Sequence, residues 1–457
     1  MKNKLKKHLV NALFTGFFSL FISAIGIANN NIPQPDQAQT IMLSGATIHT
    51  LNGAPIVNGK MVFAGGKIIA IGEATQITLP RGAREIALNG KHVYPGFISA
   101  NTALGLVESQ AVRATVDTAE LGAINPNMRA LVAINADSEL LPVARANGIL
   151  TALAVPQIGR GGLIAGTSAI IELDGWNWQQ MGLLGEAGLH IFLPSLRFSA
   201  TLFPGMPPKR LEDMQKLAEQ NLKTLEASFD SAAAYINAKN ADASQATDTR
   251  WESMRTVING GRTVFIHADE LPQIRYALTF AQRYKLKIVI VGGMDAPLIA
   301  PLLKQQEIPV VLAGIHRLPM RRGDAFDAPY RVAAHLHEAG VKFAISRSGT
   351  SFDAAHERSL PYEAATAAAY GLPIDEALKA ITVYPAQILG VADKIGTLEV
   401  GKLATFIITD GNPLEITTNV ENAYIRGKAL DLTNRQTRLQ QKYQEKYRQL
   451  GAAVPAK

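Results

Sequence analysis

The sequence contains no cysteine, which excludes disulfide bonds, thiolate nucleophiles and thiolate metal ligands. Charged residues are also scarce, at 18% of the 457 residues, whereas 47% of the residues are hydrophobic. This balance is typical of a folded protein with a large core and excludes disorder over a whole domain. The net charge of +7 is too small to indicate a nucleic acid partner.

Four of the positive charges lie at the start of the chain. Lys2, Lys4, Lys6 and Lys7 precede a mostly apolar run over residues 9–27, and small residues stand at positions 26 and 28, where a signal peptidase would act. We expect residues 1–28 to be a cleaved signal peptide and the mature protein to be periplasmic. The alternative is a membrane anchor, because the run is near the shortest length that spans a bilayer. Cleavage lowers the net charge by four, to +3, so we expect no membrane partner for the mature chain.

Two separate regions of the sequence have the pattern of a small β domain. Residues 29–40 are mostly polar and are predicted to form a linker. Short apolar runs separated by Asn-Gly and Gly-Gly pairs then fill residues 41–93, and similar runs recur over residues 393–430. Such pairs supply the positive φ angles that hairpin turns require. We therefore predict one small β-sandwich built from both ends of the chain.

The region between them, residues 94–392, alternates buried strands with helices. Continuous apolar runs such as T-V-F-I-H-A from Thr263 and K-I-V-I-V-G from Lys287 are typical of parallel strands that are covered on both faces. Between these two runs, apolar residues recur at helical spacing from Leu271 to Ala281. The alternation predicts an α/β fold, either a barrel or a doubly wound sheet.

The last segment, residues 431–457, is predicted to contain an amphipathic helix. Leu439, Tyr443, Tyr447 and Leu450 recur at helical spacing among glutamine, lysine and arginine residues. We expect this helix to pack against the body of the protein; the alternative is a helix on a membrane surface.

One stretch resembles a known family. Residues 93–105 have the sequence V-Y-P-G-F-I-S-A-N-T-A-L-G, which resembles the first barrel strand of the amidohydrolase superfamily, P-G-x-[IV]-D-x-H-x-H. Other stretches, such as G-T-L-E-V-G-K-L-A from Gly396, resemble the imidazolonepropionase-like branch of that superfamily. The resemblance implies a (β/α)8 TIM-type barrel over residues 94–392, which carries the small β-sandwich. It also implies hydrolysis of carbon–nitrogen bonds in amides or lactams at a metal centre.

The family's metal ligands are largely replaced in this sequence. The resemblance places Asn101 and Ala103 at the two histidine positions of the first barrel strand. It places Gly292 at the histidine of the sixth strand and Ser348 at the aspartate of the eighth. Only the histidine of strand five is present. In chain order these pocket positions are Asn101, Ala103, His267, Gly292 and Ser348.

Other residues remain candidates for a site. Glu172 corresponds to a lysine of some relatives, and a metal-free mechanism would pair Ser348 as nucleophile with His267 or Glu172 as base. An improvised zinc site would combine His267, Asp269, Glu270 and Glu172. The basic residues after strand seven are candidates for binding a carboxylate or phosphate, although a solvated loop is an equal alternative. They are Arg317, Arg321 and Arg322.

Three functional hypotheses follow. The first is an exported pseudoenzyme without a metal or other cofactor, which binds a small or peptide-like molecule or a paralogous protein. The second is an active amidohydrolase with a displaced or minimal metal site that uses zinc. The third is a structural subunit of an intact paralogue.

Overall fold

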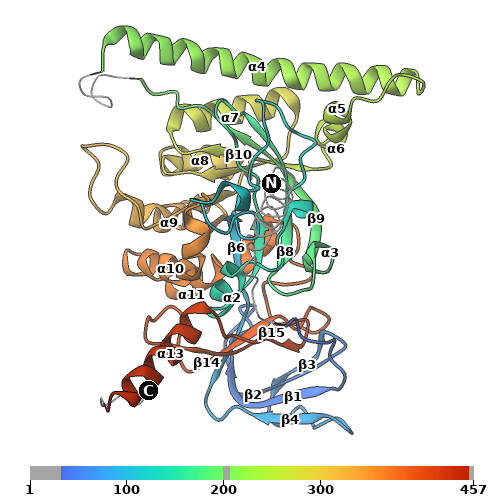
Figure 1. Ribbon diagram of the computed structural model, residues 1–457, viewed down its shortest axis with the longest axis vertical. Helices are drawn as coiled ribbons and strands as arrows, with labels where there is room; N and C mark the ends of the chain where they lie inside the picture. Colours follow the sequence, from blue (N-terminus) through green and yellow to red (C-terminus); the bar gives the residue numbers. More distant parts are fainter. Residues whose placement is uncertain (1–31, 199–205, 452–457) are drawn as a thin grey trace, which may run out of the picture. The chain divides into compact units, whose positions relative to one another are not determined.

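The computed structural model describes residues 32–198 and 206–451, and the predicted signal peptide lies outside them. The described chain contains two eight-stranded sheets, here called sheet A and sheet B, with most of the helices around sheet B (Figure 1). Residues 32–40 form no regular structure, but Asp36 pairs with Lys428 at 2.7 Å. The linker is therefore attached to the C-terminal part of sheet A.

Sheet A is built from both ends of the chain. Its strands are β1 (Ile41–Ile48), β2 (Ile56–Ala64), β3 (Lys67–Glu73), β4 (Arg84–Ala87), β5 (His92–Pro95), β14 (Phe406–Thr409), β15 (Val420–Ile425) and β16 (Lys428–Ala429). Strand β5 pairs with β1 and with β14, and this joins the two parts. The segment before β14 hydrogen bonds to β3 and to the turn before it, from Gly401 N–H to Ile68 O (2.8 Å) and from Ala404 N–H to Gly66 O (2.9 Å). The predicted sandwich is therefore one sheet that curls back on itself.

Sheet B forms a nearly closed barrel, and its strands follow one another in chain order. They are β6 (Phe97–Thr102), β7 (Ile149–Ala154), β8 (Ile164–Glu172), β9 (Gly182–Phe192), β10 (Thr263–Ala268), β11 (Ile288–Gly292), β12 (Val310–Ala313) and β13 (Phe343–Ser346). The first and last strands meet where the Ser346 hydroxyl donates to Asn101 O at 3.2 Å. The predicted fold class, a TIM-type barrel with a small β domain from both chain ends, is confirmed.

One barrel strand runs against the others. Strand β8 is antiparallel to both β7 and β9, whereas the remaining neighbours in sheet B are parallel. The C-terminal ends of the seven parallel strands therefore lie at one end of the barrel, which we call the mouth, and the C-terminal end of β8 lies at the other.

Alternation along the strands separates two apolar layers. Phe265, Val289, Val291 and Val311 belong to the cluster inside the barrel, whereas their sequence neighbours, such as Ile290, pack outward against the helices. His267 stands two residues after Phe265 and so faces the barrel axis at the mouth.

The helices connect the strands. They are α2 (Leu140–Arg145), α3 (Trp178–Met181), α4 (Pro208–Ala241), α5 (Thr249–Ser253), α6 (Arg255–Ile258), α7 (Leu271–Tyr284), α8 (Ala300–Gln305), α9 (Ala328–Glu338), α10 (Leu360–Ala369), α11 (Ile374–Lys379), α12 (Val383–Ile388) and α13 (Arg435–Gln449), with short 3-10 turns η2 (Arg113–Thr115), η3 (Ala130–Ala133), η4 (Ala296–Ile299) and η5 (Asp353–Ser359). The predicted helix after Leu271 is α7, and a capping box formed by Glu270 and Gln273 fixes its start. Among the described residues, no helix has both the length and the apolar character needed to cross a bilayer.

The C-terminal helix differs from its prediction. Residues 435–449 are helical, as the spacing of apolar residues indicates, but none of their side chains is buried. Helix α13 is attached through Arg438, which donates to both carboxylate oxygens of Glu139 at 2.9 and 3.0 Å. The expectation that its apolar face packs against the body is wrong, because the attachment is an ion pair on another face of the helix.

Candidate functional site

The mouth of the barrel holds His267 in largely apolar surroundings. Its ring stacks on Phe192 with the centroids 3.7 Å apart, and its Nε2 lies 3.0 Å from Nδ1 of the buried His190. Burial lowers the pKa of His267 to about 3, and burial followed by the charge of His267 lowers the pKa of His190 well below its usual value. Both rings are therefore neutral at pH 7, and one nitrogen of His267 already has a partner.

Asn101 and Ala103, the two positions at the end of the first barrel strand β6, do not supply metal ligands. Asn101 is 1% exposed, and its Nδ2 donates to Arg347 O at 3.3 Å. Ala103 is completely buried in the larger apolar cluster. The pairing of β6 with β7 shifts register between Ser99 and Thr102, so strict alternation does not carry through this end of the strand.

Gly292 is the last residue of β11, the sixth barrel strand, and a histidine in its place would have no room. Gly292 has a φ of +109°, and a Cβ atom there would lie 2.8 Å from Asp269 Oδ1. The Asp269 carboxylate is held by Arg317, with Nη1 at 3.2 Å from Oδ2. The glycine therefore makes room for the Asp269–Arg317 ion pair.

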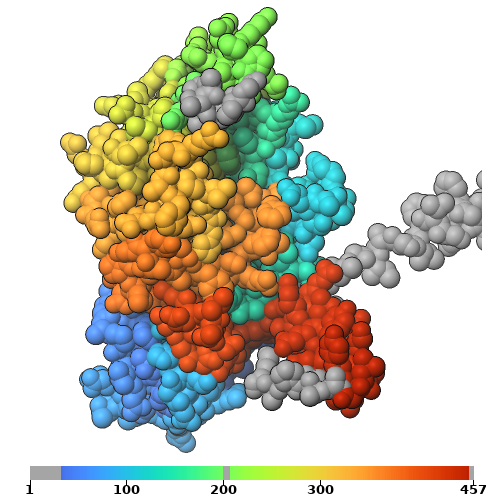
Figure 2. Space-filling model, turned by 90° about the vertical axis from the view of Figure 1, so that its left-hand side faces the viewer, coloured from blue at the N-terminus to red at the C-terminus, as the bar shows by residue number. Residues whose placement is uncertain are grey.

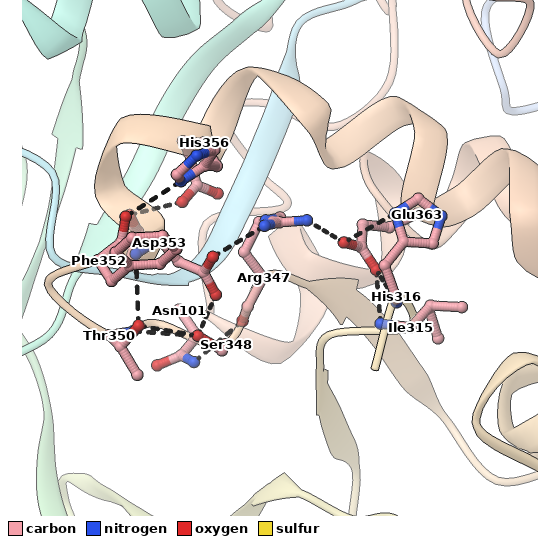
Figure 3. A network of polar contacts seen from close by, with 12 residues as sticks. Asn101, Ile315, His316, Arg347, Ser348, Thr350, Phe352, Asp353, His356 and Glu363 are labelled. Carbon is pink, nitrogen blue, oxygen red and sulfur yellow. Dashed lines mark hydrogen bonds and ion pairs between the residues drawn. The ribbon is translucent and has the colours of Figure 1, made fainter. Parts of the chain in front are cut away.

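Ser348, at the strand-eight position, follows β13 and lies in a network of charged groups, which we call the Arg347 network (Figure 3). The Arg347 guanidinium lies between two carboxylates and donates to Asp353 at 2.8 Å and to Glu363. The Ser348 hydroxyl donates to Asp353 and lies 3.1 Å from the Thr350 hydroxyl. Burial raises the pKa of Asp353, but the hydrogen bond from Ser348 and the charge of Arg347 outweigh that effect and lower it. A carboxylate with a lowered pKa is a poor base for Ser348.

Glu363 extends the Arg347 network to the neighbouring strand end. It is 1% exposed, and its Oε2 accepts from the backbone N–H groups of Ile315 at 2.5 Å and His316 at 2.7 Å (Figure 3). The His316 ring in turn lies 2.6 Å from the Thr366 hydroxyl. Arg347 and two backbone donors therefore compensate for the burial of this carboxylate.

A second buried carboxyl group escaped the sequence analysis. Glu357, on η5, is 1% exposed, and its Oε2 accepts from the Thr102 hydroxyl at 2.8 Å. Its Oε1 has no partner among the described residues. Burial raises the pKa of Glu357 to about 7, although the nearby hydroxyls of Ser99 and Thr102 and the charge of Arg347 oppose the shift. The sequence carries no pattern that would have singled out this residue.

Glu172 lies at the opposite end of the barrel from Ser348 and His267. Because β8 runs in reverse, its last residue faces Thr151 near the start of β7. The Glu172 carboxylate lies 2.6 Å from Nε of Arg426, in the turn between β15 and β16. The expectation of Glu172 as a base or ligand at the mouth is therefore wrong.

The remaining candidates also have partners. Glu270 caps α7 and accepts from the Ser195 hydroxyl at 3.0 Å. In the basic cluster, Arg317 pairs with Asp269, and Arg321 pairs with Asp295 and Asp324. Arg322 is exposed and has no ion pair within the described part of the chain. The cluster is thus largely neutralised by its own acids.

These residues do not fit a divalent metal of the kind the fold family uses. Such a site needs three or more nitrogen or oxygen ligands that converge on one point. Across residues 32–198 and 206–451, no three His, Asp or Glu side chains are arranged to hold a metal ion. Asp269, Asp353 and Glu363 are paired with arginines instead, so the arrangement offers hydrogen-bonding and charged groups for binding.

Comparisons with known proteins agree with the fold. A sequence model of the amidohydrolase family matches residues 330–430. The crystal structure of an amidohydrolase from Thermotoga maritima MSB8 superposes with a TM-score of 0.74 at 25% identity, covering 86% of this chain and 99% of that one. A structure of molinate hydrolase, at 14% identity and a TM-score of 0.53, covers 88% of this chain and 96% of that one and shows the likeness of fold alone.

One curated protein matches locally. N-acetylglucosamine-6-phosphate deacetylase from Caenorhabditis elegans is 40% identical over 78 residues. These residues are 17% of this chain and 18% of that protein, so the match spans less than a fifth of the relative.

Proposed function

Because the chain is a member of the amidohydrolase superfamily, we propose that it is an exported member that lacks the metal centre and acts by binding a small molecule or a partner protein. The general activity of the superfamily, hydrolysis of carbon–nitrogen bonds, is the alternative.

The observation that carries this proposal is the Arg347 network. A fixed guanidinium already neutralises Asp353 and Glu363, and Asp353 also accepts from Ser348 at the strand-eight position. Arginine stays charged at every physiological pH, so it would repel a divalent cation placed beside it. The same arginine and its carboxylates provide oriented groups for a polar ligand.

Metal content tests the proposal directly. We expect the mature protein, purified without a metal-binding tag, to contain far less than one zinc, iron or manganese ion per chain. The His267→Ala variant should contain the same small amount. A nearly stoichiometric metal that disappears in His267→Ala would contradict the proposal and support the hydrolase.

Turnover and thermal stability give two further readouts. With added zinc or manganese, we expect no hydrolysis of N-acetylglucosamine 6-phosphate or of an Xaa-Pro dipeptide, the compound classes that name similar proteins. Excess chelator should leave the Tm unchanged, because the charged groups at the mouth are compensated by one another. Metal-dependent turnover, or a large drop in Tm with chelator, would reject the metal-free site.

Export is tested by the mass of the mature chain. We expect it to begin near Asn29 and, at an ionic strength high enough to release surface-bound protein, to fractionate with the soluble periplasmic proteins. A membrane fraction that retains residues 1–28 would favour the anchor.

A further inference from the structure

Helix α13 turns a polar face, and not its apolar face, toward the body of the protein. Its start is fixed by Asn434, whose side chain accepts from the N–H groups of Gln436 and Thr437, and by the Arg438–Glu139 pair. At roughly 100° per residue, Thr437, Arg438 and Gln444 share one broad face, and these are its partly buried residues. The face toward the body of the protein is therefore polar.

The apolar residues lie on the other side of α13. Leu439, Tyr443, Tyr447 and Leu450 fall within one narrow stripe, and they are 42%, 50%, 49% and 69% exposed. A helix of a globular protein normally turns such a stripe toward the core. In Figure 2 this C-terminal segment, in dark red, stands at the surface. The stripe is thus available to a partner.

Basic side chains follow one edge of this stripe. Arg435, Lys442 and Lys446 lie on the same flank, are exposed and make no ion pair within the described chain. Lys446 Nζ is 5.8 and 5.9 Å from the ring centroids of Tyr443 and Tyr447. The only acid of the helix, Glu445, is bound by Arg448. With five basic residues and one acidic residue, α13 carries a net charge of +4.

We infer that α13 docks in the plane of an anionic phospholipid surface. A stripe of leucine and tyrosine beside a row of lysine and arginine suits the boundary between head groups and acyl chains. The net charge disfavours a second copy of the chain, because two helices of +4 would repel each other. With 15 residues, α13 is shorter than a bilayer-spanning helix, so docking would place it along the surface. This surface is separate from the barrel mouth, so the inference stands independently of the proposed function.

Vesicle sedimentation of the mature protein tests this inference. At low ionic strength, we expect binding to phosphatidylcholine vesicles that contain phosphatidylglycerol and little binding to phosphatidylcholine alone. Lys442→Gln with Lys446→Gln should weaken binding roughly thirtyfold, because each charge near an anionic surface is worth a factor of about five. Leu439→Ala with Tyr443→Ala should also weaken it. The matched control, Lys216→Gln with Lys223→Gln, removes two exposed lysines from α4 and should bind like the wild type.

Three outcomes would overturn the inference. One is equal binding to both kinds of vesicle, or to neither. Another is binding that the α13 variants leave unchanged. The third is a dimer or a protein complex in solution that depends on Leu439 and Tyr443 without vesicles, which would make α13 a protein-binding helix.

Discussion

Replacing Glu357 with glutamine should change how the stability of the protein depends on pH. The wild-type carboxyl is buried, has one hydrogen bond and has a pKa of about 7, compared with 4.5 for an ordinary glutamate. Below pH 4.5 it is protonated in both the folded and the unfolded chain. Between pH 4.5 and 7 the unfolded chain releases its proton while the folded protein retains it, so the folded state loses stability as the pH rises.

The size of the effect follows from the two pKa values. At about 1.4 kcal/mol per pH unit, the difference corresponds to about 3 kcal/mol, fully developed above pH 7. Glutamine is neutral at every pH, and its amide oxygen can still accept from Thr102. We therefore expect Glu357→Gln to be about as stable as the wild type at pH 4.5 and about 3 kcal/mol more stable at pH 8.

Urea denaturation at the two pH values, followed by tryptophan fluorescence, measures this difference. Glu338→Gln removes an exposed carboxylate from α9 and serves as the matched control, with no comparable change expected. If the stability difference between Glu357→Gln and the wild type were the same at both pH values, Glu357 would titrate normally and would be in contact with water.

Two further substitutions probe the mouth of the barrel. Arg347→Met should lower the free energy of unfolding by about 3–5 kcal/mol in urea denaturation, because it leaves the buried Glu363 and its neighbour Asp353 without a cation. Arg322→Met, at an exposed arginine, is the control. Equal losses in the two variants would mean that the Arg347 network does not stabilise the protein. Gly292→Ala should lower the free energy of unfolding by about 1–3 kcal/mol, because the φ of Gly292 is +109° and a Cβ atom would meet Asp269. Gly53→Ala, where a Cβ atom meets nothing, should change it little. An unchanged free energy of unfolding for Gly292→Ala would show that Asp269 moves freely.

The sequence predicted most of the barrel because its strands are buried on both faces. The runs that begin near Thr263 and Lys287 became β10 and β11, and the apolar spacing after Leu271 became α7. The reversal of β8 was not predictable in this way, since an apolar run such as that of residues 164–172 carries no sign of its direction. That reversal alone put Glu172 at the wrong end.

The site was predictable only as a set of replaced positions. The resemblance identified Gly292 and Ser348, but the groups that compensate for the replacements lie elsewhere in the chain. Asp353 and Glu363 reach Arg347 from η5 and α10, and Asp269 fills the space beside Gly292. These contacts depend on the packing of helices onto strands, which local patterns do not encode. The same limit applies to α13, whose helical spacing was evident but whose outward-facing stripe was not.

The reversed strand also bears on the order in which the barrel assembles. Strands β7, β8 and β9 form an antiparallel meander with short connections, so little chain entropy is lost when they pair. The next pairing, of β9 with β10, has to close the long segment 193–262, which includes α4. We expect the meander to be the early folding unit of an otherwise slow parallel barrel. Pulsed hydrogen exchange during refolding should protect the amides of β8 before those of β11; the reverse order would place the nucleus in the parallel half.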